Sequence, residues 1–204
     1  MVTLRPFKPD DLSALYAISL ATGHEGGDSS HLYKDLRLIG HIYSAPYAVL
    51  RPGLVIVAVD EEGVGGFVAG AADTGSWEEA LERSWWPKLR REYDDPSDRP
   101  QATWTADQRR ASMIHRPERT PDAVAKAFPA HLHINLLARL QRRGIGSALL
   151  ESWLGPAATP DAAAHVGVNC ANLGAIRFWE ARGFKALALD GPATDRTVWM
   201  GRSR

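Results

Sequence analysis

The sequence has one cysteine, no excess of either charge and no long apolar run, and each of these absences excludes a class of protein. The single thiol, Cys170, cannot form an internal disulfide and excludes a cysteine-based zinc ribbon. The 24 Lys and Arg residues equal the 24 Asp and Glu residues, so no net basic charge favours nucleic acid or anionic lipid. No stretch approaches the roughly 18 apolar residues of a membrane span, and the first residues lack a signal-peptide pattern. We therefore expect no nucleic-acid partner, no membrane partner and a cytoplasmic location.

The composition is that of one folded domain. Of the 204 residues 45% are hydrophobic and 24% are charged, and a chain of this length buries roughly 70% of its unfolded surface. Strands are expected at 2–5, 54–59 and 66–72, and helices at 12–20, 31–45 and 77–93. The last third alternates strand and helix, at 131–137, 144–154, 164–169, 172–182 and 197–201. This order predicts a single α/β domain over 1–204 with some parallel strand pairing.

The segment 94–121 departs from this regular order. It contains Pro96, Pro100, Pro117 and Pro121 among charged side chains. A structureless connection of this length is uncommon inside a compact domain and usually has a function. We expect an irregular lid or insertion at about 94–121.

A glycine-rich turn at 141–147 is the most informative stretch. Gly144 and Gly146 allow a tight turn whose N–H groups point at one centre, and the apolar run that follows predicts a helix N-terminus. Arg142 and Arg143 add positive charge, so the turn suits a pyrophosphate. Neither a Lys-Ser/Thr pair nor a third glycine is present, which argues against a Walker A loop and a dinucleotide fingerprint. The alternative is an ordinary glycine-bearing loop before a helix.

Two stretches resemble the signatures of the GNAT superfamily of N-acetyltransferases. Residues 136–150 are similar to its coenzyme A signature, with Gln141, Gly144 and Gly146 at the matching positions. Residues 168–184 are similar to its second signature, a strand, an asparagine and then a helix carrying an aromatic pair and Gly-Phe. The resemblance implies a GNAT fold, with a central mixed, twisted sheet, flanking helices and strands that splay at the coenzyme site. It also implies acetyl-CoA as cosubstrate and no metal.

A narrower likeness lies upstream of these signatures. Residues 35–40, 84–93 and 127–130 resemble the acetyltransferase-like C-terminal domain of O-GlcNAcases. In that group the domain is fused to a glycosidase, and its catalytic competence is doubtful where the phosphate loop is degraded. Here the loop is intact and no glycosidase is present, so the likeness implies a free-standing relative that can bind the coenzyme.

The GNAT resemblance also implies roles for individual residues. In the family an amine attacks acetyl-CoA directly in a ternary complex, and the fourth strand usually carries a bulge and splays from the fifth. On this chain the N–H of Leu136 or Leu137 would face the thioester carbonyl. The backbone amides expected to hold the pyrophosphate are those of Gln141, Arg142, Arg143, Gly144, Ile145, Gly146 and Ser147. Asn172 would bond the pantetheine arm, and Ala175 and Phe178 would pack against it.

The predicted strand at 131–137 supplies candidates for the base. Strand alternation places His131, His133 and Asn135 on one face. A histidine titrates near neutrality and can take a proton from an ammonium directly or through water. We therefore predict His133 as base or water-holder, with His131 behind it; the alternative is two strand histidines satisfied by their neighbours. Two histidines without a third ligand do not predict zinc.

Trp179 departs from the family pattern, which commonly has a tyrosine there as the acid that protonates the thiolate. An indole N–H donates a hydrogen bond but does not release a proton near neutral pH. Either another hydroxyl serves, with Tyr33, Tyr43 and Tyr47 as candidates, or the thiolate leaves without an acid. In the simpler interpretation Trp179 only forms a wall of the coenzyme cleft.

The function expected from these observations is acetyl-CoA-dependent N-acetyl transfer to a small-molecule amine or a protein lysine. One rival is a non-catalytic acetyl-CoA-binding module, which Trp179 favours. A second rival is a partner-binding domain that uses the tryptophan-rich stretch 77–104, which predicts an exposed apolar patch there. The sequence decides neither the acceptor nor the oligomeric state.

Overall fold

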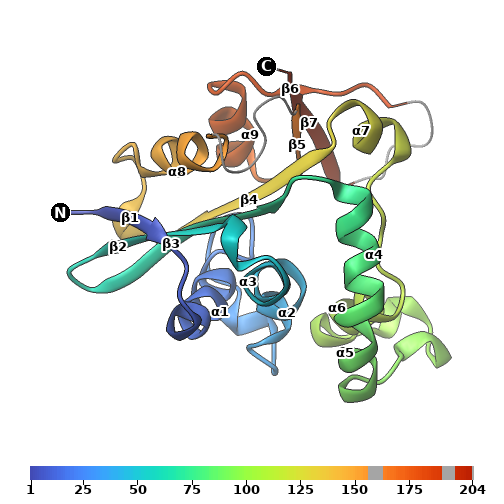
Figure 1. The fold of residues 1–204 in the computed structure, drawn as a ribbon. Coiled ribbons are helices and arrows are strands. Elements are labelled where there is room, and N and C mark those ends of the chain that lie inside the picture. The colour runs from blue at the N-terminus through green and yellow to red at the C-terminus, as the bar shows by residue number, and fades with distance from the viewer. Residues whose placement is uncertain (156–162, 190–195, 204) are drawn as a thin grey trace.

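The computed structural model describes residues 1–155, 163–189 and 196–203, and its centre is a seven-stranded sheet (Figure 1). The strand order is β1-β2-β3-β4-β5-β7-β6. Every neighbouring pair is antiparallel except β4 and β5, so the sheet is mixed, as expected. The strands are β1 (Thr3–Pro6), β2 (Val55–Asp60), β3 (Gly63–Ala71), β4 (Ala130–Leu136), β5 (Ala164–Asn169), β6 (Lys185–Ala186) and β7 (Thr197–Arg202).

Helices cover both faces of this sheet, which confirms the α/β class. In Figure 1, α8 and α9 lie above β4, while α1, α2 and α3 lie below it and α4, α5 and α6 stand to one side. The helices are α1 (Leu12–Ala21), α2 (Leu38–Tyr43), α3 (Ala45–Leu50), α4 (Thr74–Ser84), α5 (Trp86–Glu92), α6 (Ala106–His115), α7 (Asp122–Ala127), α8 (Ile145–Trp153) and α9 (Leu173–Glu180). None of the described helices is long and apolar enough to cross a membrane.

Strand alternation divides the buried side chains into two hydrophobic cores. Val57 and Phe67 point into the first core, between the sheet and α1–α3. Ala58 and Val68 point into the second core, between the sheet and α8 and α9. Since successive residues of a strand face opposite sides of the sheet, this division follows directly from the sequence of β2 and β3.

The tryptophan-rich stretch forms two helices, not the single helix expected over 77–93. The first helix, α4, ends at Ser84, and α5 begins at Trp86 with Pro87 in its first turn. Proline has no N–H to donate to the carbonyl one turn back, so a continuous helix cannot pass this point. Trp77, Trp85 and Trp86 are buried in the first core.

The segment 94–121 is more ordered than its proline content predicts. It contains α6, whose N-terminus is closed by reciprocal hydrogen bonds between Thr105 and Gln108. Ala111 and Ile114 of this helix are buried, and α6 packs against α2 and α5. This part of the expected irregular lid or insertion is therefore a packed helix, and its action as a lid stays a prediction.

The sheet splays open between its two parallel strands. Strand β4 pairs with β5 only at Ala130 and His131, whereas it pairs with β3 from Leu136 back to His131. The register between β3 and β4 is unbroken, so the bulge expected in the fourth strand is absent, and the shift in the sheet lies at Ala58/Val59 in β2. The expectation of a splay is therefore confirmed, and that of a bulge in β4 is wrong.

Candidate active site

Beyond His131, the edge of β4 that faces β5 has no partner strand among the described residues. Leu137 donates its N–H to the Gly65 carbonyl at 2.8 Å, so these two residues form a hydrogen-bonded pair across β3 and β4. In an antiparallel ladder such pairs alternate, so the N–H and carbonyl of Leu136 point the other way, toward β5. Of the two donors expected here, the Leu136 N–H faces the splay, whereas the Leu137 N–H is bonded to Gly65; the contact of either residue with a coenzyme stays a prediction.

The predicted pyrophosphate turn begins close to this edge. Gln141 donates its side-chain amide to the Leu136 carbonyl at 2.9 Å. Gly144 has a left-handed φ of 76° and precedes the first residue of α8, Ile145, and no described side chain caps this end of the helix. Arg142 is also left-handed, with φ of 57°. The first N–H groups of α8 are thus left for water or an anion.

The two glycines of the turn, Gly144 and Gly146, have different structural roles. A Cβ on Gly144 would meet nothing within 4 Å, so its left-handed backbone is what requires glycine. A Cβ on Gly146 would lie 2.9 Å from the ring of Phe178 and 3.5 Å from Leu136. Gly146 therefore allows α8, α9 and the open edge of β4 to approach one another.

An arginine that the sequence analysis left unassigned completes this region. Arg182, just beyond α9, donates through Nε and Nη2 to Ser147 Oγ, and its Nε–Oγ distance is 3.0 Å. Its guanidinium lies 4.0 Å from the centre of the Phe178 ring and donates to the Phe178 carbonyl. The second signature, residues 168–184, contains no feature that predicts the contact between Arg182 and Ser147, because only the packing of α9 on α8 creates it.

The remaining residues expected at the coenzyme have structural contacts in α9. Asn172 caps the helix by accepting the Ala175 N–H at 3.0 Å, so its Oδ1 is engaged. Trp179 is buried in the second core, where its ring lies edge-on to Phe178 and Phe184. These contacts make Trp179 a packing residue of α9, and its contact with a coenzyme stays a prediction.

On the other face of β4, a hydrogen-bonded chain links the two strand histidines. Tyr47, from α3, lies with its hydroxyl 2.7 Å from His131 Nε2 and 3.2 Å from His133 Nε2. The second nitrogen of His131, Nδ1, lies 2.8 Å from Thr74 Oγ1. Thr74 in turn donates its hydroxyl to the Pro129 carbonyl at 2.8 Å.

The distances in this hydrogen-bonded chain indicate where each proton lies. Since two oxygens 2.8 Å apart repel without a proton between them, the Thr74 proton points at Pro129, and Thr74 accepts from His131 Nδ1–H. His131 Nε2 is then an acceptor for the Tyr47 hydroxyl, and Tyr47 accepts from His133 Nε2–H. The lone pair of His133 therefore lies on Nδ1, which has no partner in the part of the chain that the structure describes.

Burial keeps both histidines neutral. It lowers the pKa of His133 to about 4 and the pKa of His131 well below its usual 6.5, with the charge of His165 adding to both effects. The sequence predicted a histidine base that titrates near neutrality. With its lowered pKa, His133 does not. His131 has both nitrogens engaged and so has none left for a substrate.

Asn135 and two of the candidate acids, Tyr43 and Tyr47, are also constrained by their neighbours. Asn135 donates to Thr22 Oγ1 at 2.7 Å, which ties β4 to the end of α1. The Tyr47 hydroxyl proton is directed to His131, and burial raises the pKa of Tyr47. Burial likewise raises the pKa of Tyr43, so neither phenol is a ready proton donor at neutral pH.

Comparison with solved structures decides the family. No protein-family model matches the chain. The structure is similar to that of SsHAT, with 35% sequence identity and a TM-score of 0.88, over 99% of this chain and 98% of that one. The chain belongs to the GNAT superfamily of N-acetyltransferases.

More distant GNAT likenesses concern the fold. An N-acetyltransferase from Staphylococcus aureus Mu50 is 16% identical with a TM-score of 0.61, over 98% of this chain and 99% of that chain. The loading GNATL domain of CurA from Lyngbya majuscula is also 16% identical, with a TM-score of 0.54, over 100% of this chain and 98% of that domain.

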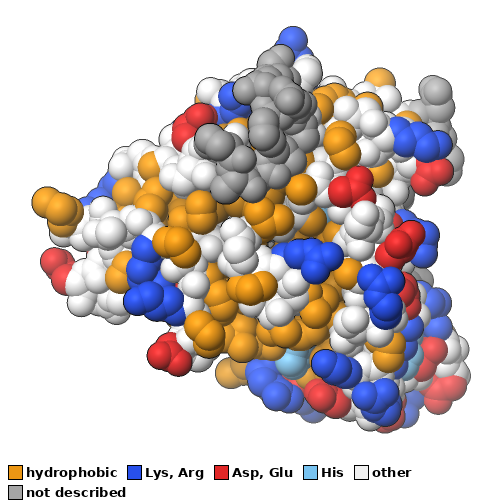
Figure 2. Space-filling model, viewed as in Figure 1, with side chains coloured by type: hydrophobic (Ala, Val, Ile, Leu, Met, Phe, Trp, Pro, Cys, Tyr) orange, Lys and Arg blue, Asp and Glu red, His pale blue; other side chains and the backbone are white. Residues whose placement is uncertain are grey.

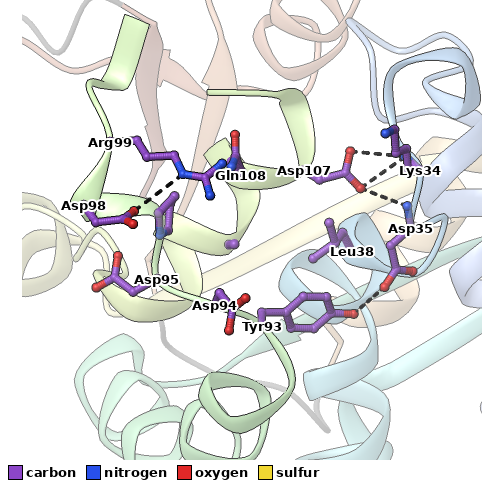
Figure 3. Close-up of a pocket in the computed structure, with 12 residues that line it drawn as sticks. Lys34, Asp35, Leu38, Tyr93, Asp94, Asp95, Asp98, Arg99, Asp107 and Gln108 are labelled. Carbon is purple, nitrogen blue, oxygen red and sulfur yellow. Dashed lines mark hydrogen bonds and ion pairs between the residues drawn. The ribbon is translucent and has the colours of Figure 1, made fainter. Parts of the chain in front are cut away.

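This GNAT chain also has a pocket of about 670 Å³ between α2, the end of α5 and α6 (Figure 3). None of the residues predicted as site residues lines it. Of its carboxylates, Asp107 accepts the N–H groups of Lys34 and Asp35, and Asp35 accepts the Tyr93 hydroxyl at 2.7 Å. These bonds hold α6 and the end of α5 to the segment before α2. Within the described ranges no group of three or more His, Cys, Asp or Glu could hold a metal ion.

Proposed function

We propose that the protein is an acetyl-CoA-dependent N-acetyltransferase that transfers acetyl directly to an amine in a ternary complex. The observation that carries this proposal is the open edge of β4 beside the uncapped N-terminus of α8. The Leu136 N–H faces that edge, and no described side chain caps the first N–H groups of α8. Membership of the GNAT superfamily also supports acetyl transfer as the activity.

The residues present fit the coenzyme. Backbone N–H groups of the 141–147 turn would hold its pyrophosphate, and the Arg182 guanidinium adds positive charge at Ser147. The open edge of β4 would bond the pantetheine amides as a neighbouring strand would. Hydrophobic side chains gather across the middle of the face drawn in Figure 2, with Lys and Arg among them, which suits a ligand with an apolar arm and an anionic end. When bound, acetyl-CoA supplies an acyl thioester.

His133 is assigned to orient the attacking amine. Its Nδ1 lone pair accepts a hydrogen bond from an amine N–H, directly or through one water, while Tyr47 holds its Nε2–H. With a pKa of about 4, His133 is a weak base, so it aligns a neutral amine and passes the proton to water instead of storing it. His131 and Asn135 are positioning residues here. The Nε2 of His131 is bonded to Tyr47, and the side-chain N–H of Asn135 is donated to Thr22, so these atoms do not reach a substrate.

Two measurements test this proposal. Calorimetry with a chelator present should show acetyl-CoA binding, and thiol release should depend on an added amine. Gly144→Asp should weaken binding because it adds a carboxylate to the turn and puts a side chain on a left-handed residue. Absence of binding at millimolar acetyl-CoA would make the proposal wrong. Binding without amine-dependent thiol release would instead support the non-catalytic acetyl-CoA-binding module.

The partner-binding alternative loses its main support. It required an exposed apolar patch in the stretch 77–104, but Trp77, Trp85 and Trp86 are buried. The exposed large hydrophobic residues among the described ones all lie outside that stretch. Trimming of this part of the chain is therefore expected to disturb the first core before it disturbs any partner.

A further inference from the structure

One arginine of α6 has no acidic partner among the described residues. Arg110, on α6, donates from Nε to the Tyr33 hydroxyl and from Nη1 to the Tyr43 hydroxyl, both at 3.0 Å. Its guanidinium lies 6.0 Å from the centre of the Tyr33 ring and 5.6 Å from that of Tyr43. Within the described ranges no carboxylate lies within 4 Å of it, and the carboxylate of Asp107 on the same helix is bonded to backbone N–H groups.

The donors around this guanidinium are not all used. Arg110 Nη2 has no partner in the described part of the chain, and it is not a buried atom, because His41 Nε2 alone is both buried and unpartnered there. The Tyr33 hydroxyl accepts from Arg110, and its own proton has no acceptor among the described residues. A positive charge with two unused donors beside it matches an anion, and a guanidinium binds carboxylates with good geometry.

Tyr43 connects this cation to the proposed amine site. The Tyr43 ring meets the His133 ring edge-on with centroids 6.4 Å apart, and its hydroxyl accepts from Arg110. Tyr43, His133 and Arg110 are each partly exposed, and the Tyr43 ring lies beside both His133 and the Arg110 guanidinium. A ligand that touched both His133 and Arg110 would therefore reach past the Tyr43 ring, whose centre lies 5.6 Å from the Arg110 guanidinium.

We infer that the acceptor is a small primary amine that also carries a carboxylate, with the amine at His133 and the carboxylate at Arg110. This inference rests on the proposed function and adds the class of acceptor. A lysine within a peptide has its own carboxyl group converted to an amide, so it would leave Arg110 without a charge partner. Peptide lysines are thus the alternative that the experiment must separate.

The test compares matched acceptors that differ only in this charge. Thiol release is measured with 4-aminobutanoate and 4-aminobutanamide, with 6-aminohexanoate and its amide, and with an uncharged lysine peptide. Loss of a charge-assisted hydrogen bond predicts that wild-type kcat/KM falls about 10- to 100-fold from each acid to its amide. Arg110→Gln should remove this preference, mainly through KM of the acids, while acetyl-CoA affinity stays unchanged. Arg109→Gln, at the exposed neighbour, should keep it.

A binding measurement keeps the inference separate from the proposed function. With the protein saturated by coenzyme A, which cannot react, 4-aminobutanoate should bind more tightly than its amide, and only in proteins that retain Arg110. Equal turnover of acids and amides, a preference that survives Arg110→Gln, or a best rate with the lysine peptide would each overturn the inference. If no amine is turned over, the proposed function fails and the binding measurement alone decides the role of Arg110.

Discussion

Replacing Tyr47 with Phe removes a single oxygen from the centre of the histidine chain. The Tyr47 ring stacks on Trp77 with centroids 4.3 Å apart and planes inclined by 16°, and Phe keeps that contact. What is lost is the hydroxyl that donates to His131 Nε2 and accepts from His133 Nε2–H. The variant therefore tests the chain itself and leaves the core volume almost unchanged.

The expected magnitudes follow from the burial of the two partners. His131 is 8% exposed, so its Nε2 becomes a buried acceptor without a donor, which costs about 1–3 kcal/mol of unfolding free energy. His133 is partly exposed and can turn to water. For a domain of this size each kcal/mol shifts Tm by roughly 2–4 °C, so a loss of about 2 kcal/mol lowers Tm by roughly 4–8 °C. Because the Nε2–H of His133 is then no longer held by Tyr47, kcat/KM should fall about tenfold. This loss is smaller than the 10²–10⁴-fold typical of a removed general base.

Tyr16→Phe is the matched control for this substitution. Tyr16 also bonds a histidine, with its hydroxyl 2.8 Å from His41 Nδ1, but His41 is on α2 and not on β4. Thermal unfolding and amine-dependent thiol release should show lower Tm in both variants and lower kcat/KM only in Tyr47→Phe. If Tyr47→Phe loses stability yet keeps full kcat/KM, the hydrogen-bonded chain is structural and the orientation of His133 does not depend on it.

Three further results are expected. Gly146→Ala should weaken acetyl-CoA binding measured by calorimetry, because the added Cβ would press on Phe178. The Cβ added by Gly144→Ala meets no atom, so this variant should lose only about 1–2 kcal/mol through strain of its left-handed backbone. Stability to urea should be greatest above pH 6.5 and fall toward pH 4. In this window the histidines of the unfolded chain take up protons, whereas His131 and His133 of the folded protein, whose pKa values are lowered, do not; a flat profile would contradict this. The rise of kcat/KM with pH should follow the pKa of the acceptor amine and move when the acceptor changes, and a fixed inflection near pH 6.5 would return the proton to a histidine.

Much of the fold and part of the site could be predicted from the sequence because they depend on local patterns. The glycine-rich turn and the apolar run after it predicted the uncapped start of α8 at Gly144. Two-residue alternation placed His131, His133 and Asn135 on one face of β4, where their hydrogen bonds lie. The two signatures indicated the family without any knowledge of packing.

Other features depended on contacts between distant segments, which no local pattern encodes. Tyr47 lies 84 residues from His131 in the sequence, yet its hydroxyl fixes the protons of both histidines. Desolvation by the assembled core, and not residue type, moved the pKa of His133 away from neutrality. Arg110 reached the neighbourhood of His133 only because α6 packs on α2, and Arg182 reached Ser147 only because α9 packs on α8. The sequence by itself therefore determined the backbone framework and the family, and the tertiary structure decided which side chains meet and in which protonation state.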